Sequence, residues 1–124
     1  MENKPTIYTF DPVIYPRMVW ITVTNESKLE GFSGVPKMDE CIDAEVDEVH
    51  DAVNNLGGVL IRFKNIQAIC TCSITHESNH AAMAIFDYVG AKFVYSNQEP
   101  FCYLAGWIAK CCAEVKEKEL LKIK

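Results

Sequence analysis

The stretch HESNHAAMAIF, residues 76–86, joins an H-E-x-x-H motif to a run of good helix formers. Because residues four apart lie on one face of a helix, the imidazoles of His76 and His80 can converge on one metal ion. Glu77 follows the first histidine, where it can reach a metal-bound water without being a ligand. Zinc suits the pair, since it accepts neutral imidazole nitrogens and keeps a position open for water. The pattern predicts a helix that carries a zinc site, and the alternative is a polar helix start with two surface histidines.

The size and charge of the chain narrow the classes of protein it belongs to. A length of 124 residues is enough for one domain with one hydrophobic core, and the hydrophobic content of 49% is that of an ordinary soluble globular protein. The net charge is −5 and no cluster of basic residues stands out. We therefore expect neither nucleic acid nor an anionic membrane as a partner. The sequence does not indicate an oligomeric state, and a homo-oligomer stays open.

Neither a signal peptide nor a membrane span is indicated by the distribution of apolar residues. No apolar core follows the first residues, and no apolar run approaches the length of a membrane span. We therefore expect a cytoplasmic protein. Its six cysteines should then be reduced and mostly buried, and none of their spacings is that of a C-x-x-C zinc knuckle.

The first half of the chain predicts two strands, a loop and a helix. Strands are expected at residues 6–10 and 17–24 from their β-branched and aromatic residues, and glycine and proline mark residues 25–37 as a loop. A packing helix is expected over residues 39–56, ended by two glycines. Its apolar residues recur at helical spacing: Ile42, Val46, Val49, Val53 and Leu56.

The second half predicts a hairpin and two helices. The strands of the hairpin are expected at residues 59–63 and 66–73, and the motif helix at about residues 74–88 with Gly90 closing it. Met83, Phe86 and Val89 should face the core from this helix. A last helix is expected over residues 97–121, with residues 116–124 as a solvated, fraying end. Its predicted buried face consists of Phe101, Leu104, Ile108, Cys111, Cys112 and Val115.

These elements predict one α+β domain with a small, mainly antiparallel sheet, a packing helix, the motif helix and a C-terminal helix. A hydrolytic zinc site normally has three protein ligands, so the motif needs a third. Asp87 lies two turns beyond His80 on the same helix, which is too far. Glu99 lies at the start of the next helix, which can fold back over the first, and it is the preferred candidate. Alternatively, Glu99 caps its own helix, and His50 could either be half-buried in the fold or face the metal.

With these residues, the sequence resembles the gluzincin metallopeptidases, and in length the single-domain minigluzincins. The resemblance implies a zincin-like domain with zinc bound by His76, His80 and Glu99, and with Glu77 as the catalytic base. The chain departs from the family pattern in that Tyr103 stands where an aspartate usually orients the first histidine. The segment NQEPFCYLAGW, residues 97–107, is also similar to small uncharacterised proteins of phages and prophages.

The resemblance implies a peptide or protein substrate and a zinc-activated water as the nucleophile. Glu77 would accept the proton of that water and return it to the leaving amine. Tyr103 is the first choice for an additional oxyanion donor, ahead of Tyr88, Tyr95 and His50. The strand expected upstream of the motif would form the edge of the cleft. Two other hypotheses stay open: a zinc-binding module without catalysis, and a metal-free interaction protein.

Overall fold

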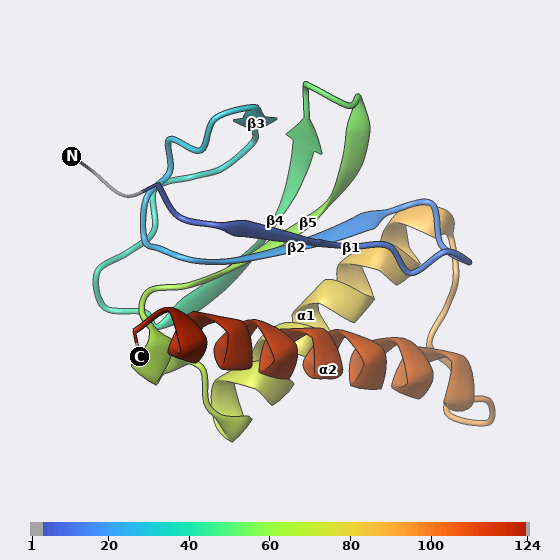
Figure 1. Cartoon of the computed structure of the whole chain (residues 1–124). Coiled ribbons are helices and arrows are strands. Elements are labelled where there is room, and N and C mark those ends of the chain that lie inside the picture. The colour runs from blue at the N-terminus through green and yellow to red at the C-terminus, as the bar shows by residue number, and fades with distance from the viewer. Residues whose placement is uncertain (1–3, 124) are drawn as a thin grey trace.

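The computed structural model describes residues 4–123, which form an α+β fold of five strands followed by two long helices (Figure 1). A short 3-10 helix, η1 (Ile66–Ala68), links the last strand to the helices. The helices are α1 (Thr71–Val89) and α2 (Glu99–Lys122). The strands are β1 (Ile7–Phe10), β2 (Met18–Val23), β3 (Phe32–Ser33), β4 (Ala44–Asp51) and β5 (Leu56–Phe63).

The strands form one curled, mixed sheet in the order β1-β2-β5-β4-β3. The central pair, β2 and β5, is parallel, and the other three pairings are antiparallel. Gly58 allows the close approach of the central strands, because a Cβ atom at this position would lie 2.1 Å from the carbonyl oxygen of Met18. The expectation of a mainly antiparallel sheet therefore holds for three of the four pairings.

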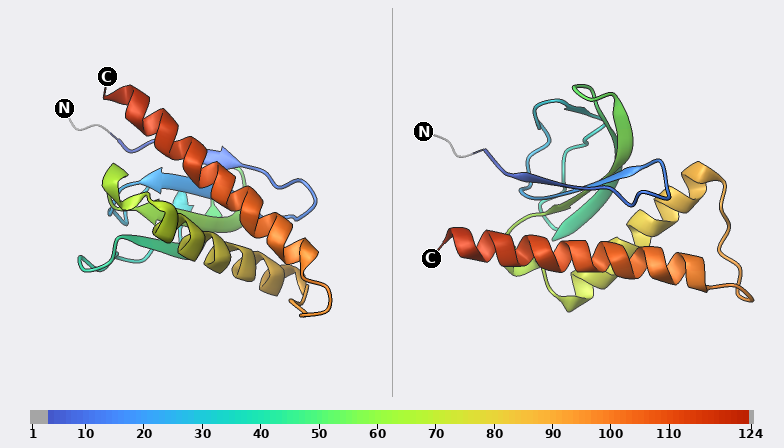
Figure 2. Two further views of the ribbon diagram at one scale, coloured as in Figure 1. Left: turned by 90° about the horizontal axis from the view of Figure 1, so that it is seen from below. Right: turned by 45° about the vertical axis from the view of Figure 1, so that its right-hand side comes forward.

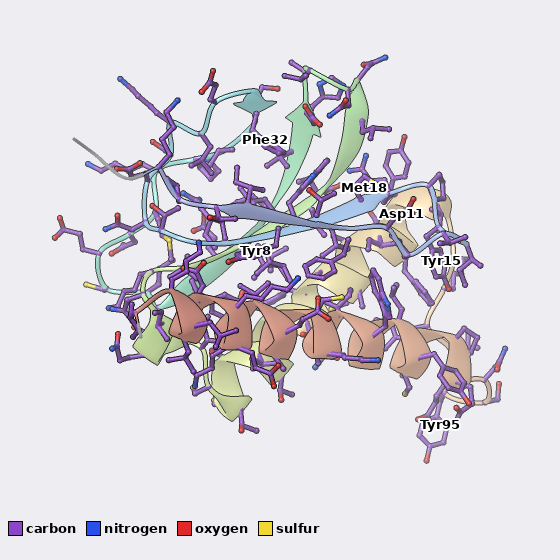
Figure 3. All side chains as sticks on the ribbon, viewed as in Figure 1. Tyr8, Asp11, Tyr15, Met18, Phe32 and Tyr95 are labelled. Carbon is purple, nitrogen blue, oxygen red and sulfur yellow. The ribbon has the colours of Figure 1, made fainter. Side chains whose placement is uncertain are left out.

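Both helices cover the same face of the sheet, as the view from below shows (Figure 2). The main core lies between them and the sheet and includes Val19, Ile61 and Phe63, which are fully buried. The opposite face is covered by the segment between β2 and β4, which folds back over the sheet (Figure 1). There the ring of Phe32, labelled in Figure 3, meets that of Trp20 edge-on at 5.0 Å.

The C-terminal helix has the predicted buried face, and all six of its predicted apolar residues are buried. The prediction that residues 116–124 fray is wrong as far as Lys122, because the helix continues to that residue. The end of α2 is held by β1: Tyr8 donates a hydrogen bond to Glu119, and Lys122 donates one of 2.6 Å to the hydroxyl of Thr6. Lys124 lies outside the described residues.

The predicted packing helix at residues 39–56 is wrong, because this segment forms β4 and the turn into β5. Val46 faces the helices, whereas Val49 faces the other way, so the apolar positions belong to two faces of a strand. The side chain of Asp51 accepts hydrogen bonds from the backbone of the turn, and Asn55 there adopts a φ of 55°. Val53 is 79% exposed and has no place in the core.

The predicted strand at residues 66–73 is also wrong, since these residues form η1 and the start of α1. Two local caps account for the difference. The side chain of Asn65 accepts a hydrogen bond from the backbone of Ala68, and the hydroxyl of Ser73 accepts one from the backbone of Cys70. The motif helix and its closing Gly90, which has a φ of 76°, are confirmed, although the helix begins at Thr71.

Two further features bear on the predictions made from the sequence. Among residues 4–123, neither helix is long and apolar enough to cross a membrane. All six cysteines are free thiols, but only Cys111 and Cys112 are buried, so the expectation that most would be buried is wrong.

Candidate functional site

The helix α1 brings the two histidines of the motif together. The Nε2 atoms of His76 and His80 lie 3.1 Å apart, and both side chains are exposed. Two nitrogen ligands at opposite ends of one edge of a zinc tetrahedron are about 3.3 Å apart, given zinc–nitrogen bonds of about 2.0–2.1 Å. The pair therefore has the spacing that two corners of a zinc site require.

Glu77 lies beneath the histidines rather than beside them on the surface. Its side chain is only 7% exposed, because its position on α1 turns it toward the sheet. This burial raises the pKa of Glu77, the charges of His76 and His80 oppose the rise, and the charge of Asp47 adds to it. A buried carboxylate with a raised pKa accepts a proton readily, as a general base must.

A shallow hollow lies between α1 and β4, and the whole motif borders it. It is lined by His76, Glu77, His80 and Ala84 from the helix and by residues 44–48 from the strand. The strand β3 pairs only with the last two residues of β4, and Gly34 packs against the backbone of Glu48 and Val49, so within the described chain the outer edge of residues 44–47 has no strand partner. The hollow thus runs beneath an open sheet edge.

The carboxylates of β4 around the hollow are bound to arginines. Arg62, which is fully buried, contacts Glu45 at 2.8 Å and Asp47 at 3.0 Å. Arg17 contacts Glu48 at 3.3 Å. Arg62, Glu45 and Asp47 form an acid–arginine cluster on the face of the sheet away from the helices, whereas Arg17 and Glu48 pair on the face toward α1. Sequence reasoning missed both groups. The acidic run was visible in the sequence, but its arginine partners come from β5 and from the residue that precedes β2.

Contacts with α1 and with β5 position Arg17. The guanidinium of Arg17 lies 3.8 Å above the ring of Tyr88 on α1, and Gly57 makes room for it, since a Cβ there would lie 2.3 Å from Nη1 of Arg17. Burial is the main cause that raises the pKa of Glu45 to about 7, and hydrogen bonding to Asp47 adds to the rise.

The structure does not place Glu99 near the histidines. The ring centroids of Phe86 and Phe101 are 5.4 Å apart, so these two residues lie side by side at the same height along the helix pair. His80 lies six residues before Phe86, and Glu99 lies two residues before Phe101 on a helix that runs back in the opposite direction. At about 1.5 Å of rise per residue, Glu99 is roughly 12 Å from the level of His80. It is exposed at the far end of the helix pair.

Three of the four expected oxyanion donors also lie elsewhere. Tyr103 is 74% exposed and borders an apolar pocket with Tyr15 and Trp107, on the side of α2 away from the motif. Tyr95 points away from the rest of the chain on the α1–α2 connection (Figure 3). His50 is exposed at the end of β4, where it forms a hydrogen bond of 2.9 Å with Asn55.

The motif helix also places its apolar residues differently from the prediction. Phe86 is buried as expected, but Met83 is 55% exposed and lies on the same side of α1 as the histidines. The inward face of α1 carries Glu77, Ser78, Ala81, Ala82, Ile85 and Phe86.

Two histidine nitrogens fit one zinc ion, whereas Glu99 does not complete the set. Among residues 4–123, no group of three histidine, cysteine or acidic side chains is arranged to hold a metal. The chain matches no protein-family model, no curated protein and no solved structure.

Proposed function

We propose that this protein is a zinc-dependent hydrolase, most simply a peptidase, in which His76 and His80 hold the metal and Glu77 acts as the general base. The observation that carries the proposal is the 3.1 Å separation of the two Nε2 atoms at the rim of the hollow that Glu77 also borders. The resemblance to the gluzincins points to the same chemistry.

Zinc, when bound, supplies a water of lowered pKa and polarises the scissile carbonyl. The protein's own part is to position the proton carrier. Because burial raises the pKa of Glu77, its carboxylate accepts a proton more readily than an exposed glutamate does. It then returns the proton to the leaving amine. Glu99 and Tyr103 have no role in this proposal, because both lie away from the hollow.

An extended peptide is the substrate that the surroundings favour. The edge of β4 at residues 44–47 has no strand partner and runs along the hollow, and an added strand would bring its backbone toward the histidines. This edge replaces the one expected at residues 66–73, which is helical. The charges of Glu45, Asp47 and Glu48 also protect the edge against unspecific strand pairing.

The test compares metal content and peptide cleavage in four proteins prepared without a nickel column. Wild type and Glu77→Gln should bind zinc, whereas His80→Ala should lose it. Glu99→Ala should bind zinc like wild type, which separates this proposal from the gluzincin ligand set. Cleavage of a mixed peptide library should occur with wild type and Glu99→Ala and disappear with Glu77→Gln. Absence of zinc from the wild type, together with no heat stabilisation on adding zinc, would refute the proposal.

A second candidate function is a zinc-binding module without catalysis. It is favoured by the fact that residues 4–123 bring together two zinc ligands and not the three of a hydrolytic site. In that case wild type and Glu77→Gln bind zinc equally and neither cleaves any peptide.

A further inference from the structure

The histidine pair leaves two corners of a zinc tetrahedron to be filled, and the nearby carboxylates have other partners. If Glu45 or Asp47 turned away to bind a metal, the ion pairs of Arg62 would weaken, and the side chain of Arg62 is fully buried. An uncompensated buried charge is strongly destabilising. Glu48 is held by Arg17, which is itself fixed between Tyr88 and Gly57.

The histidines also border a second surface, on the outer side of α1. This outer groove is lined only by uncharged residues besides the two histidines: Thr71, Cys72, Thr75, Asn79 and Met83. The groove is wide open, and Glu77 does not border it. A second helix can approach such a face without burying a charge other than the metal itself.

The same face on a second copy of this chain supplies the missing ligands. A two-fold axis through the metal sets His76 and His80 of one copy opposite the identical pair of the other. The resulting four imidazole nitrogens are a complete tetrahedral set for zinc. The symmetry also requires that the outer groove of each copy packs on that of its partner.

We propose that zinc bridges two copies of this chain through His76 and His80 of each. The inference rests on the proposed zinc site but not on catalysis. With four imidazoles the zinc has no open position for water, so the bridged dimer is a closed, resting form of the site. Hydrolysis then requires separation of the copies, which turns the metal toward the hollow that Glu77 borders.

Zinc should control the association rather than merely accompany it. Each copy carries a net charge of −5, so two metal-free copies repel each other. The dimer should therefore form on addition of zinc and separate on chelation.

The test measures molar mass by light scattering and zinc stoichiometry by native mass spectrometry. Metal-free wild type should have the 14.0 kDa mass of one chain, and zinc should double it, with one zinc for two chains. His76→Ala should remain monomeric in zinc. Glu99→Ala, altered at the far end of the helices, is the matched control and should dimerise like wild type. Specific peptidase activity should fall as the protein concentration rises through the dimerisation range.

The outcomes separate the two proposals. One zinc per monomeric chain would overturn the bridged dimer and leave the hydrolase standing, and loss of that zinc in Glu48→Gln would assign the third ligand to β4. A zinc-bridged dimer without any peptidase activity would support the bridge and refute the hydrolase. Absence of zinc binding would overturn both.

Discussion

Replacing the buried Arg62 by methionine should destabilise the protein more than removing the basic partner of any of the other described ion pairs. The guanidinium contacts Glu45 and Asp47 at 2.8 and 3.0 Å, and donates a third bond of 3.0 Å to the carbonyl of Glu26. Methionine matches the length of the stem but leaves two adjacent carboxylates and a carbonyl without their donor.

The expected magnitude follows from this burial. Removing one partner of a buried ion pair typically costs about 3–5 kcal/mol. At about 2.1 cal/mol/K of unfolding entropy per residue, the 124 residues of the chain give about 0.26 kcal/mol/K. The melting temperature of Arg62→Met should therefore fall by about 10–20 °C.

Urea unfolding followed by circular dichroism measures the loss, with Lys64→Met as the control. Lys64 pairs with Asp43 at 2.9 Å, but both side chains are partly exposed, so its loss should cost less than about 1 kcal/mol. Adding Glu45→Gln and Asp47→Asn to Arg62→Met should recover part of the stability, because the repelling charges are removed. A loss as small as that of the control, with no recovery in the triple variant, would show that the cluster does not hold the sheet together.

Three further predictions concern a titration, the thiols and the sheet. Because burial raises the pKa of Glu45 to about 7 from 4.5, its protonated form stabilises the fold, so this stability is complete below the unfolded pKa and is lost as pH rises through about 7. Melting temperature should fall over that range in wild type and much less in Glu45→Gln. Burial raises the pKa of Cys111 and of Cys112 to about 12, so a thiol reagent should modify only the other four cysteines until the protein unfolds. Gly58→Ala should abolish cooperative unfolding, since the new methyl group would overlap the carbonyl of Met18, and a variant that folds normally would contradict the described strand contact.

The sequence predicted correctly those features that depend only on residues close together in the chain. The buried face of α2 and the end of α1 at Gly90 are confirmed because helical spacing and a left-handed cap are properties of neighbouring residues. The helix predicted over residues 39–56 is wrong because the spacing of its apolar residues fits a helix as well as a strand. Val46 and Val49 are three residues apart, as on one face of a helix, but they lie on opposite faces of β4. As a strand it pairs with β5 along eight residues, and its carboxylates contact the buried Arg62 of β5; no local pattern predicts these contacts.

In the candidate site, too, local spacing predicted one feature and not the other. The convergence of His76 and His80 follows from a spacing of four on a helix, and the structure shows it. The position of Glu99 depends on how long α1 continues before the chain turns back, which the motif does not specify. Because α1 extends nine residues beyond His80, the start of α2 lies at the far end of the helix pair. The hypothesis that Glu99 completes the set therefore lacks support from its placement.

The side of α1 toward which the imidazoles turn determines what a bound zinc can do. Successive residues of a helix are about 100° apart, so the buried Glu77 marks the inward border of the histidine stripe and Met83 marks its outward side. A zinc ion over the inner hollow is close to Glu77 and to the open edge of β4, and there it can serve hydrolysis. A zinc ion on the side of the outer groove has its remaining coordination positions turned away from both, so it joins two helices. Because one pair of histidines borders both surfaces, the hydrolase and the bridged dimer exclude each other at any one moment, and zinc-dependent dimerisation should inhibit rather than activate turnover.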